Sequence, residues 1–257
     1  MLLRRLIDHV RAQNWTAVAL DFLIVVVGVF IGIQVSNWNS ARTDARREHE
    51  ILRSILTDIV ADQRQIETAL RFAEINIDAG NYALMAAGSS AVEQMHLPAD
   101  PSEVLDSNTF VIDPPPDDMS DRVESLWQLS TVRYFPAQND AALDALITAG
   151  DLSLITNREI IENLQEYRQL WSNVLLTQDS TYRPFRNQAV FVGQRLGLSP
   201  FAETDLETYT ALLASDEEVS SSLRTLIEFA VLHRSQLVVV NQAAHDLTMM
   251  IQQELNP

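Results

Sequence analysis

A long uncharged stretch near the start of the chain is the strongest pattern in the sequence. Residues 22–41 carry no charge, and at about 1.5 Å per residue a helix of this length spans roughly 30 Å, the thickness of a hydrocarbon core. The pattern predicts a transmembrane anchor over residues 15–40, after a basic flank of residues 1–14, with Trp15 and Trp38 at the two headgroup regions. A cleavable signal peptide and a buried helix of a soluble core are the alternatives.

Small and polar residues inside the predicted span suggest that it packs against another helix. Gly28 and Gly32 form a GxxxG step, which allows two membrane helices to approach closely. Asp21 and Gln34 are polar groups within or beside the apolar run, and such groups gain from polar contacts with another subunit. Ordinary membrane-helix composition explains the glycines equally well, and water at the membrane surface is the alternative surrounding for Asp21.

After the span, apolar residues recur at steps of three and four, which predicts an all-α acidic domain over residues 41–257. The predicted membrane helix continues to about Ala79, with one apolar seam that consists of Leu52, Ile55, Ile59, Gln63, Ile66, Leu70, Ala73 and Ile77. A loop-rich, Pro-rich section follows at about 88–136, because proline interrupts helices. Further helices are predicted over 141–148, from Asn157 to about Leu175, and over 181–196, 203–214 and 217–255. The expected apolar face of the last helix carries Leu223, Leu226, Ile227, Ala230, Val231, Arg234, Leu237 and Val238. Gly150 and Asn157 have the residue types that end one helix and begin the next.

Composition and charge exclude several classes of function. The chain has 35 acidic and 18 basic residues, with a net charge of −17, and 33 of the acidic residues lie in 41–257. A negatively charged protein surface does not attract the phosphates of a nucleic acid, so nucleic acid is not an expected partner. The absence of cysteine excludes disulfides, thiolate catalysis and zinc–thiolate sites.

Candidate chemistry is sparse. No zinc-peptidase, serine-hydrolase or nucleotide-binding motif occurs, so we predict no catalytic residue, no cofactor, no metal ligand and no enzyme activity. Asp58 and Asp62 share a face of the predicted helix, but an acidic chain produces such pairs by chance. An aspartate cluster at 113–121 favours a charge-rich turn over a calcium site. The scattered histidines are expected at interfaces or on the surface: His9, His49, His96, His233 and His245.

One local cluster in the acidic domain combines aromatic rings with cations. Tyr182, Arg183, Phe185 and Arg186 lie within five positions, and such a cluster is a possible contact for a partner or an anion. The alternative is the start of an amphipathic helix whose arginines pair with neighbouring acids.

Two segments resemble an uncharacterised family of bacterial membrane proteins with one N-terminal span and a helical soluble domain. The first, DFLIVVVGVFIGIQVSNWN at residues 21–39, is similar to the family's acidic residue, aliphatic run and closing Asn-Trp-Asn. The second, ALDALITAGDLSLITNREIIENLQEY at 142–167, resembles its helix, glycine turn and second helix. The resemblance implies membrane residence and a helical domain, and it implies no activity.

These observations predict a single-pass protein of the bacterial inner membrane that acts as an interaction or scaffolding module. Its expected partners are the lipid bilayer and other membrane-protein subunits or a second copy of itself. The arginines on the two sides of the span are balanced, and a cytoplasmic N-terminus with a periplasmic domain is the preferred orientation. The alternatives are a periplasmic small-ligand sensor that acts through a partner and an enzyme with an unrecognised site.

Overall fold

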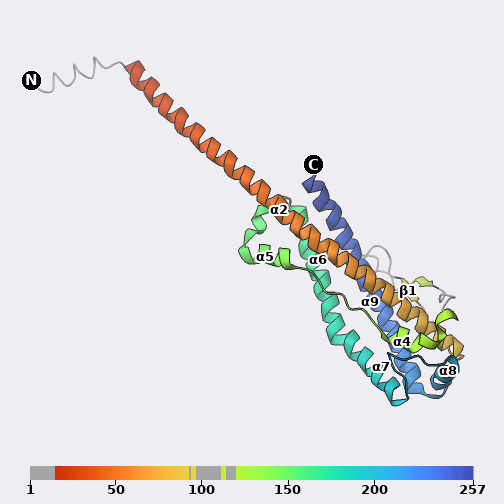
Figure 1. The fold of residues 1–257 in the computed structure, drawn as a ribbon. Helices are drawn as coiled ribbons and strands as arrows, with labels where there is room; N and C mark the ends of the chain where they lie inside the picture. Colours follow the sequence, from red (N-terminus) through yellow and green to blue (C-terminus); the bar gives the residue numbers. More distant parts are fainter. Residues whose placement is uncertain (1–14, 93, 97–110, 114–119, 257) are drawn as a thin grey trace, which may run out of the picture. The chain divides into compact units, whose positions relative to one another are not determined.

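The computed structural model describes residues 15–92, 94–96, 111–113 and 120–256 (Figure 1). These residues are helical for the most part, which confirms the predicted all-α class. The exception lies in the predicted loop-rich section, where strand β1 (Gln94–His96) pairs antiparallel with β2 (Val111–Asp113). The chain divides into two compact units between Glu50 and Ile51.

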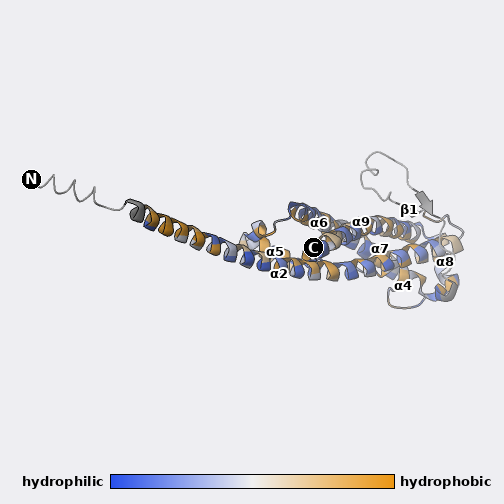
Figure 2. Ribbon diagram, turned by 90° about the horizontal axis from the view of Figure 1, so that it is seen from above, coloured by the Kyte–Doolittle hydropathy of each residue, from blue (hydrophilic) through white to orange (hydrophobic). Residues whose placement is uncertain are grey.

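Helix α2 (Trp15–Ala86) begins in the first unit and ends in the second. In the first unit, every side chain from Ala19 to Arg47 is exposed. Figure 2 shows that the first part of this helix is predominantly apolar. Within the described residues, α2 is the one helix long and apolar enough to cross a membrane.

The second unit is a bundle in which α2 packs with the helices that follow it in sequence. Helix α6, the short π-helical turn η3 and α7 follow one another directly (Figure 1). The α-helices are α4 (Leu126–Thr131), α5 (Ala141–Ala149), α6 (Arg158–Thr177), α7 (Arg183–Arg195), α8 (Leu206–Ser215) and α9 (Glu217–Leu255). The shorter turns are η1 (Ser120–Ser125), η2 (Asp151–Leu154) and η3 (Gln178–Tyr182).

The predicted helix boundaries between α5 and α6 are confirmed. Gly150 follows α5 with φ of 73°, a left-handed conformation that glycine adopts without steric cost. Asn157 precedes α6, and its side chain accepts a hydrogen bond from the backbone N–H of Glu159, so it caps the helix as expected.

Helix α2 continues to Ala86, beyond the predicted end near Ala79. The extra turns pack tightly against α9, because Gly80 lies where an added Cβ would be 2.6 Å from Ile227 Cγ1. A glycine in a helix interior weakens the local pattern, and here it permits this close approach. The helix then stops before Gly88, which has φ of 78°.

The apolar core of the second unit consists of two separate clusters along the bundle. The first joins α2, α5, α6 and the C-terminal half of α9 through residues such as Leu52, Ile59, Ile66, Leu143, Leu164, Trp171, Leu237 and Leu247. The second joins α2, α4, α7, α8 and the N-terminal half of α9 through residues such as Ile77, Leu84, Trp127, Val192, Tyr209, Leu223 and Ile227. The apolar core is therefore divided in two, and polar residues lie between the clusters.

The buried face of α9 differs from the expected one. Arg234 and Val238 were expected near the apolar face, yet Val238 is 46 % exposed and Arg234 pairs with Glu74 of α2 at 3.3 Å. His233 and Val240 are buried in their place. Different neighbours contact the two halves of this long helix, so its buried stripe is wider than a single periodic face.

Candidate functional site

A layer of buried polar side chains lies between the two apolar clusters. Asn76 comes from α2, Gln178 and Tyr182 from η3, His233 from α9, and Arg133 from the extended segment after α4. The first four are at most 2 % exposed, and Arg133 is partly buried. We call these five residues the polar layer. Burial of a polar group is unfavourable unless the group is paired. The polar layer therefore differs from the two apolar clusters in needing hydrogen bonds to be stable.

Arg133 is held by neutral groups. Its Nη2 donates to the carbonyl oxygen of Leu226 at 3.0 Å, and its Nε donates to Asn76 Oδ1 at 3.3 Å. Its guanidinium carbon lies 5.8 Å from the centroid of the Tyr182 ring. Burial, opposed by Tyr182 and assisted by the nearby Arg186, lowers the pKa of Arg133 to about 10. No carboxylate among the described residues pairs with this cation.

His233 contradicts the expectation of a surface or interfacial histidine. The side chain has no exposed area, and its Nε2 lies 3.3 Å from Gln178 Nε2. Its ring also lies 5.1 Å from the Tyr182 centroid and 5.8 Å from that of Phe135. Burial lowers the pKa of His233 to about 3, with a further contribution from Arg133. The residue is therefore neutral in the folded protein at ordinary pH.

The predicted aromatic and cationic cluster divides between core and surface. Tyr182 is in the polar layer, where its hydroxyl donates to Gln236 at 3.1 Å and burial raises its pKa to about 12. Arg183 pairs with Asp179 at 2.9 Å and lies over the ring of Phe135. Phe185 is 44 % exposed, and its ring packs at a tilt against Phe229. Arg186 is partly buried and donates to the carbonyl of Thr131 at 3.0 Å.

An extended segment carries Arg133 into the layer. This segment, residues 132–140, lies along α2 in the opposite direction, and we call it the strap. Asn76 donates to the carbonyl of Val132 at 2.7 Å, and Gln65 Oε1 accepts from the N–H of Ala137 at 3.1 Å. The strap thereby satisfies part of its backbone hydrogen bonding with side chains of a helix.

The carboxylates of α2 hold the far end of the strap. Asp62 is fully buried, and its Oδ1 accepts from the N–H of Asn139 at 2.6 Å and from Asn139 Nδ2 at 2.9 Å. Its Oδ2 accepts from the Tyr167 hydroxyl of α6 at 2.8 Å. Asp58 accepts from the N–H of Ala142 at the start of α5, at 2.9 Å. Burial raises the pKa of Asp62, although these hydrogen bonds oppose the change. The Asp58–Asp62 pair is thus structural, a role that helix spacing alone did not reveal.

The predicted packing residues of the span do not all share one face. At about 100° per residue, Asp21, Gly28 and Gly32 fall within roughly 40° of one another, whereas Gln34 lies on the opposite side. An added Cβ at either glycine would contact nothing within 4 Å, so this face is open. Trp38 is 66 % exposed with Arg42 over its ring at 5.9 Å. The side chain of Trp15 is outside the part that the structure describes.

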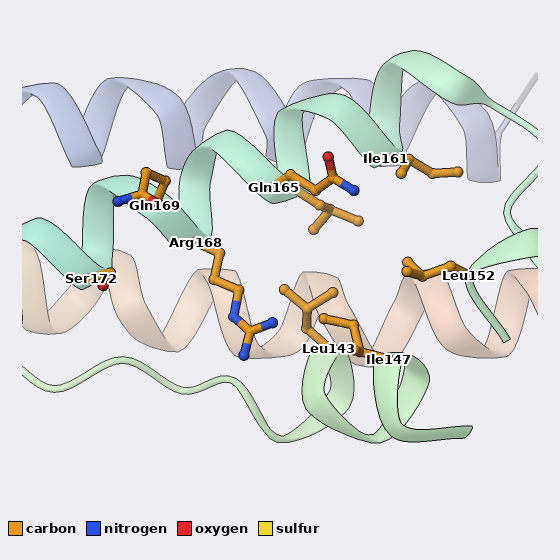
Figure 3. A pocket seen from close by; sticks show the side chains of 9 residues that line it. Leu143, Ile147, Leu152, Ile161, Gln165, Arg168, Gln169 and Ser172 are labelled. Atoms are coloured by element: carbon orange, nitrogen blue, oxygen red, sulfur yellow. The ribbon is translucent and has the colours of Figure 1, made fainter. Parts of the chain in front are cut away.

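A separate groove of about 440 Å³ lies between α5, η2 and α6 (Figure 3). Its volume is within the range of small-molecule sites. Arg168 reaches from α6 towards α5, where it pairs with Asp144 at 3.0 Å. The apolar part of the groove consists of Leu143, Ile147, Leu152, Ile161 and Leu164. The polar part consists of Gln165, Arg168, Gln169 and Ser172.

Neither a metal site in the described residues nor a similar known protein assigns a function to this chain. Among the residues that the structure describes, no group of three or more His, Asp or Glu side chains is arranged to hold a metal ion. No family model, curated protein or solved structure matches this chain significantly.

Proposed function

We propose that this chain is a membrane-anchored interaction or scaffolding protein of the bacterial inner membrane. In this proposal, the N-terminal part of α2 crosses the bilayer once, and the helical domain assembles with other membrane-protein subunits or with a second copy. The two segments that resemble the single-span family lie in the anchor and around the α5–α6 turn, and they support the same assignment.

The observation that carries the proposal is the continuous exposure of apolar side chains along α2. Soluble monomers rarely expose apolar patches of more than a few hundred Å², whereas a lipid-facing helix does so throughout. The exposed fraction of these side chains ranges from 45 % for Val26 to 71 % for Phe22. The exposed apolar residues are Leu20, Phe22, Leu23, Ile24, Val25, Val26, Val27, Val29, Phe30, Ile31, Ile33, Val35 and Trp38.

Membrane extraction tests the anchor. We expect the native chain to stay in the pellet when membranes are washed with alkaline carbonate. The double substitution Val29→Arg and Phe30→Arg is expected to release most of it, because each charge at a bilayer centre costs about 2.5–3.5 kcal/mol on an insertion scale. The substitutions Thr57→Arg and Glu67→Arg, at exposed positions of the same helix, are the control and should leave the chain in the pellet. A native chain found in the carbonate supernatant would disprove the anchor.

Cysteine crosslinking tests self-association through the glycine face. The chain has no native cysteine, so single substitutions report one position each. Val35 lies about 20° from Gly28 around the helix, and Val26 lies about 160° away. We expect Val35→Cys to form disulfide-linked dimers in oxidised membranes in several-fold greater yield than Val26→Cys. Equal yields would rule out this face as the contact between copies, and a membrane-bound monomer would leave only the anchor part of the proposal.

The orientation in the proposal places the N-terminus in the cytoplasm and the helical domain in the periplasm. A reporter fused after Pro257 that is active only in the periplasm tests this. Activity of a cytoplasm-specific reporter at the same position would reverse the orientation without affecting the anchor.

The groove between α5 and α6 favours a second candidate function, a small-ligand sensor that acts through a partner. Its apolar walls and few polar groups have the composition of ligand sites. Because α6 also contributes Tyr167 to the Asp62 hydrogen bonds, a ligand that moves α6 would act on α2, the helix of the proposed anchor.

A further inference from the structure

Two exposed arginines follow the apolar run of α2 within about two helical turns. Arg42 and Arg46 lie about 6 and 12 Å past Trp38 along the helix axis, and we call them the arginine pair. Both side chains are exposed. No carboxylate among the described residues forms an ion pair with either of them. Both cations are therefore accessible to an anion from outside the chain.

The arginine pair shares one face of α2 with Trp38. At about 100° per residue, Arg42 and Arg46 lie about 40° and 80° around the helix from Trp38. The guanidinium carbon of Arg42 lies 5.9 Å from the centroid of the Trp38 ring, which is a cation–π contact. The first cation of the pair is thereby held beside the end of the apolar run.

The acidic residues of the same segment do not neutralise this face. Residues 42–50 contain three arginines and three acids, so the distribution of charge around the helix matters more than its sum. Asp44 lies about 160° around the helix from Arg46. Glu48 is buried, and both Glu48 and Glu50 have interactions of their own. The face that carries Trp38 is therefore positive within a chain of net charge −17.

Anionic phospholipids have the charge and the position that fit the arginine pair. In the proposed anchor, Trp38 lies among the lipid headgroups, so cations one and two turns further lie near the lipid phosphates. Each basic residue beside a span strengthens attraction to an anionic membrane surface by about fivefold in affinity. We propose that the arginine pair binds the phosphates of anionic phospholipids in the leaflet at the C-terminal end of the span. This inference rests on the proposed anchor and adds a preferred class of lipid.

Competition between two lipids tests the proposal. The full chain is purified in a mild detergent that contains equal amounts of phosphatidylglycerol and phosphatidylcholine with the same acyl chains, and native mass spectrometry counts the bound lipids of each class. We expect the native chain to prefer phosphatidylglycerol several-fold. The double substitution Arg42→Gln and Arg46→Gln should lower this preference by about threefold or more. Substitution of both residues by lysine keeps the charges and should keep most of the preference. A preference that the glutamine substitutions leave unchanged would overturn the proposal.

Two arginines further along α2 provide a control for total charge. Arg53 and Arg64 are exposed, and they lie about 22 and 39 Å past Trp38 along the helix, which is more than the Debye length of about 10 Å at 0.1 M salt. The double substitution Arg53→Gln and Arg64→Gln should keep the lipid preference within about 1.5-fold of the native chain. An equal fall in this control would indicate a general effect of charge and would also overturn the proposal. The arginines of residues 1–14 are present in every variant, so their contribution cancels in the comparison.

Vesicle flotation separates failure of this inference from failure of the anchor. After reconstitution into vesicles of phosphatidylcholine alone, which carry no net charge, the native chain and the Arg42→Gln, Arg46→Gln variant should both float with the vesicles. A native chain that does not float would disprove the anchor and, with it, the lipid contact. A native chain that floats but binds the two lipids equally would disprove the lipid contact alone.

Discussion

Substitution of Asp62 by alanine is expected to lower the free energy of unfolding by about 3–5 kcal/mol. The change removes the acceptor for three hydrogen bonds, from the Asn139 N–H, Asn139 Nδ2 and the Tyr167 hydroxyl. The carboxylate is fully buried, so water cannot replace it without entering the core. Urea unfolding of the full chain in detergent, followed by circular dichroism at 222 nm, measures the effect.

Two matched variants show whether burial and charge explain the loss. Asp58→Ala, one turn earlier on α2, removes a single acceptor for the Ala142 N–H and is expected to cost about 1 kcal/mol. Asp62→Asn keeps the size of the side chain and one acceptor oxygen. Its loss in free energy of unfolding should therefore lie between those of Asp62→Ala and Asp58→Ala. Similar losses for Asp62→Ala and Asp58→Ala would show that the strap is not held mainly by Asp62.

Acid is expected to destabilise the native chain more than a His233→Gln variant. The pKa of His233 is about 3 in the folded protein and about 6.5 when it is unfolded. Between these values the unfolded state binds a proton that the folded state does not, so stability rises with pH and is lost as pH falls. For this residue the slope reaches about 1.4 kcal/mol per pH unit near pH 5. The difference between the native chain and the variant should therefore change by about 2–3 kcal/mol from pH 6 to pH 4.

Comparison of slopes separates His233 from other titrating groups. Burial and the neighbouring Glu74 raise the pKa of Asp78 to about 6, and a raised carboxyl pKa makes stability fall as pH rises through this range. That opposing contribution is common to all variants and cancels in the difference. His245→Gln, at an exposed position of α9, is the control: its free energy of unfolding should change with pH as it does in the native chain. If the free energy of unfolding of His233→Gln changes with pH as it does in the native chain, His233 binds its proton equally in the folded and unfolded states, which contradicts the prediction.

Local signals were sufficient for most helices of the second unit. Gly150 and Asn157 act on hydrogen bonds within a few residues of themselves, so their roles are visible in the residue types alone. Helix α9 was predicted over 217–255 and is observed as Glu217–Leu255. Where Gly80 weakens the local preference, the predicted end of α2 fell short, because the close packing against Ile227 that a glycine permits there is not visible in the local pattern.

No local sequence pattern predicted the polar layer or the strap. Asp62 binds a residue 77 positions away and another 105 positions away, and His233 contacts Gln178 across 55 positions. The strap also needs a match in length. From Val132 to Asn139 an extended chain covers roughly 23 Å, close to the roughly 21 Å along α2 from Asn76 to Asp62. Polar residues on the buried stripes, such as Asn76 and His233, were the only hint in the sequence.

By itself, the sequence determined that the chain is helical, that one N-terminal stretch is apolar enough to cross a membrane, and where most later helices begin and end. These properties depend on hydropathy, periodicity and caps, which act over one or two helical turns. The tertiary structure decided which polar groups are buried, that Asp58 and Asp62 hold the strap, and that Arg133 and His233 both lie near Tyr182 between two apolar clusters. Burial and pairing depend on which distant segments come together, and no local pattern of residues encodes that choice.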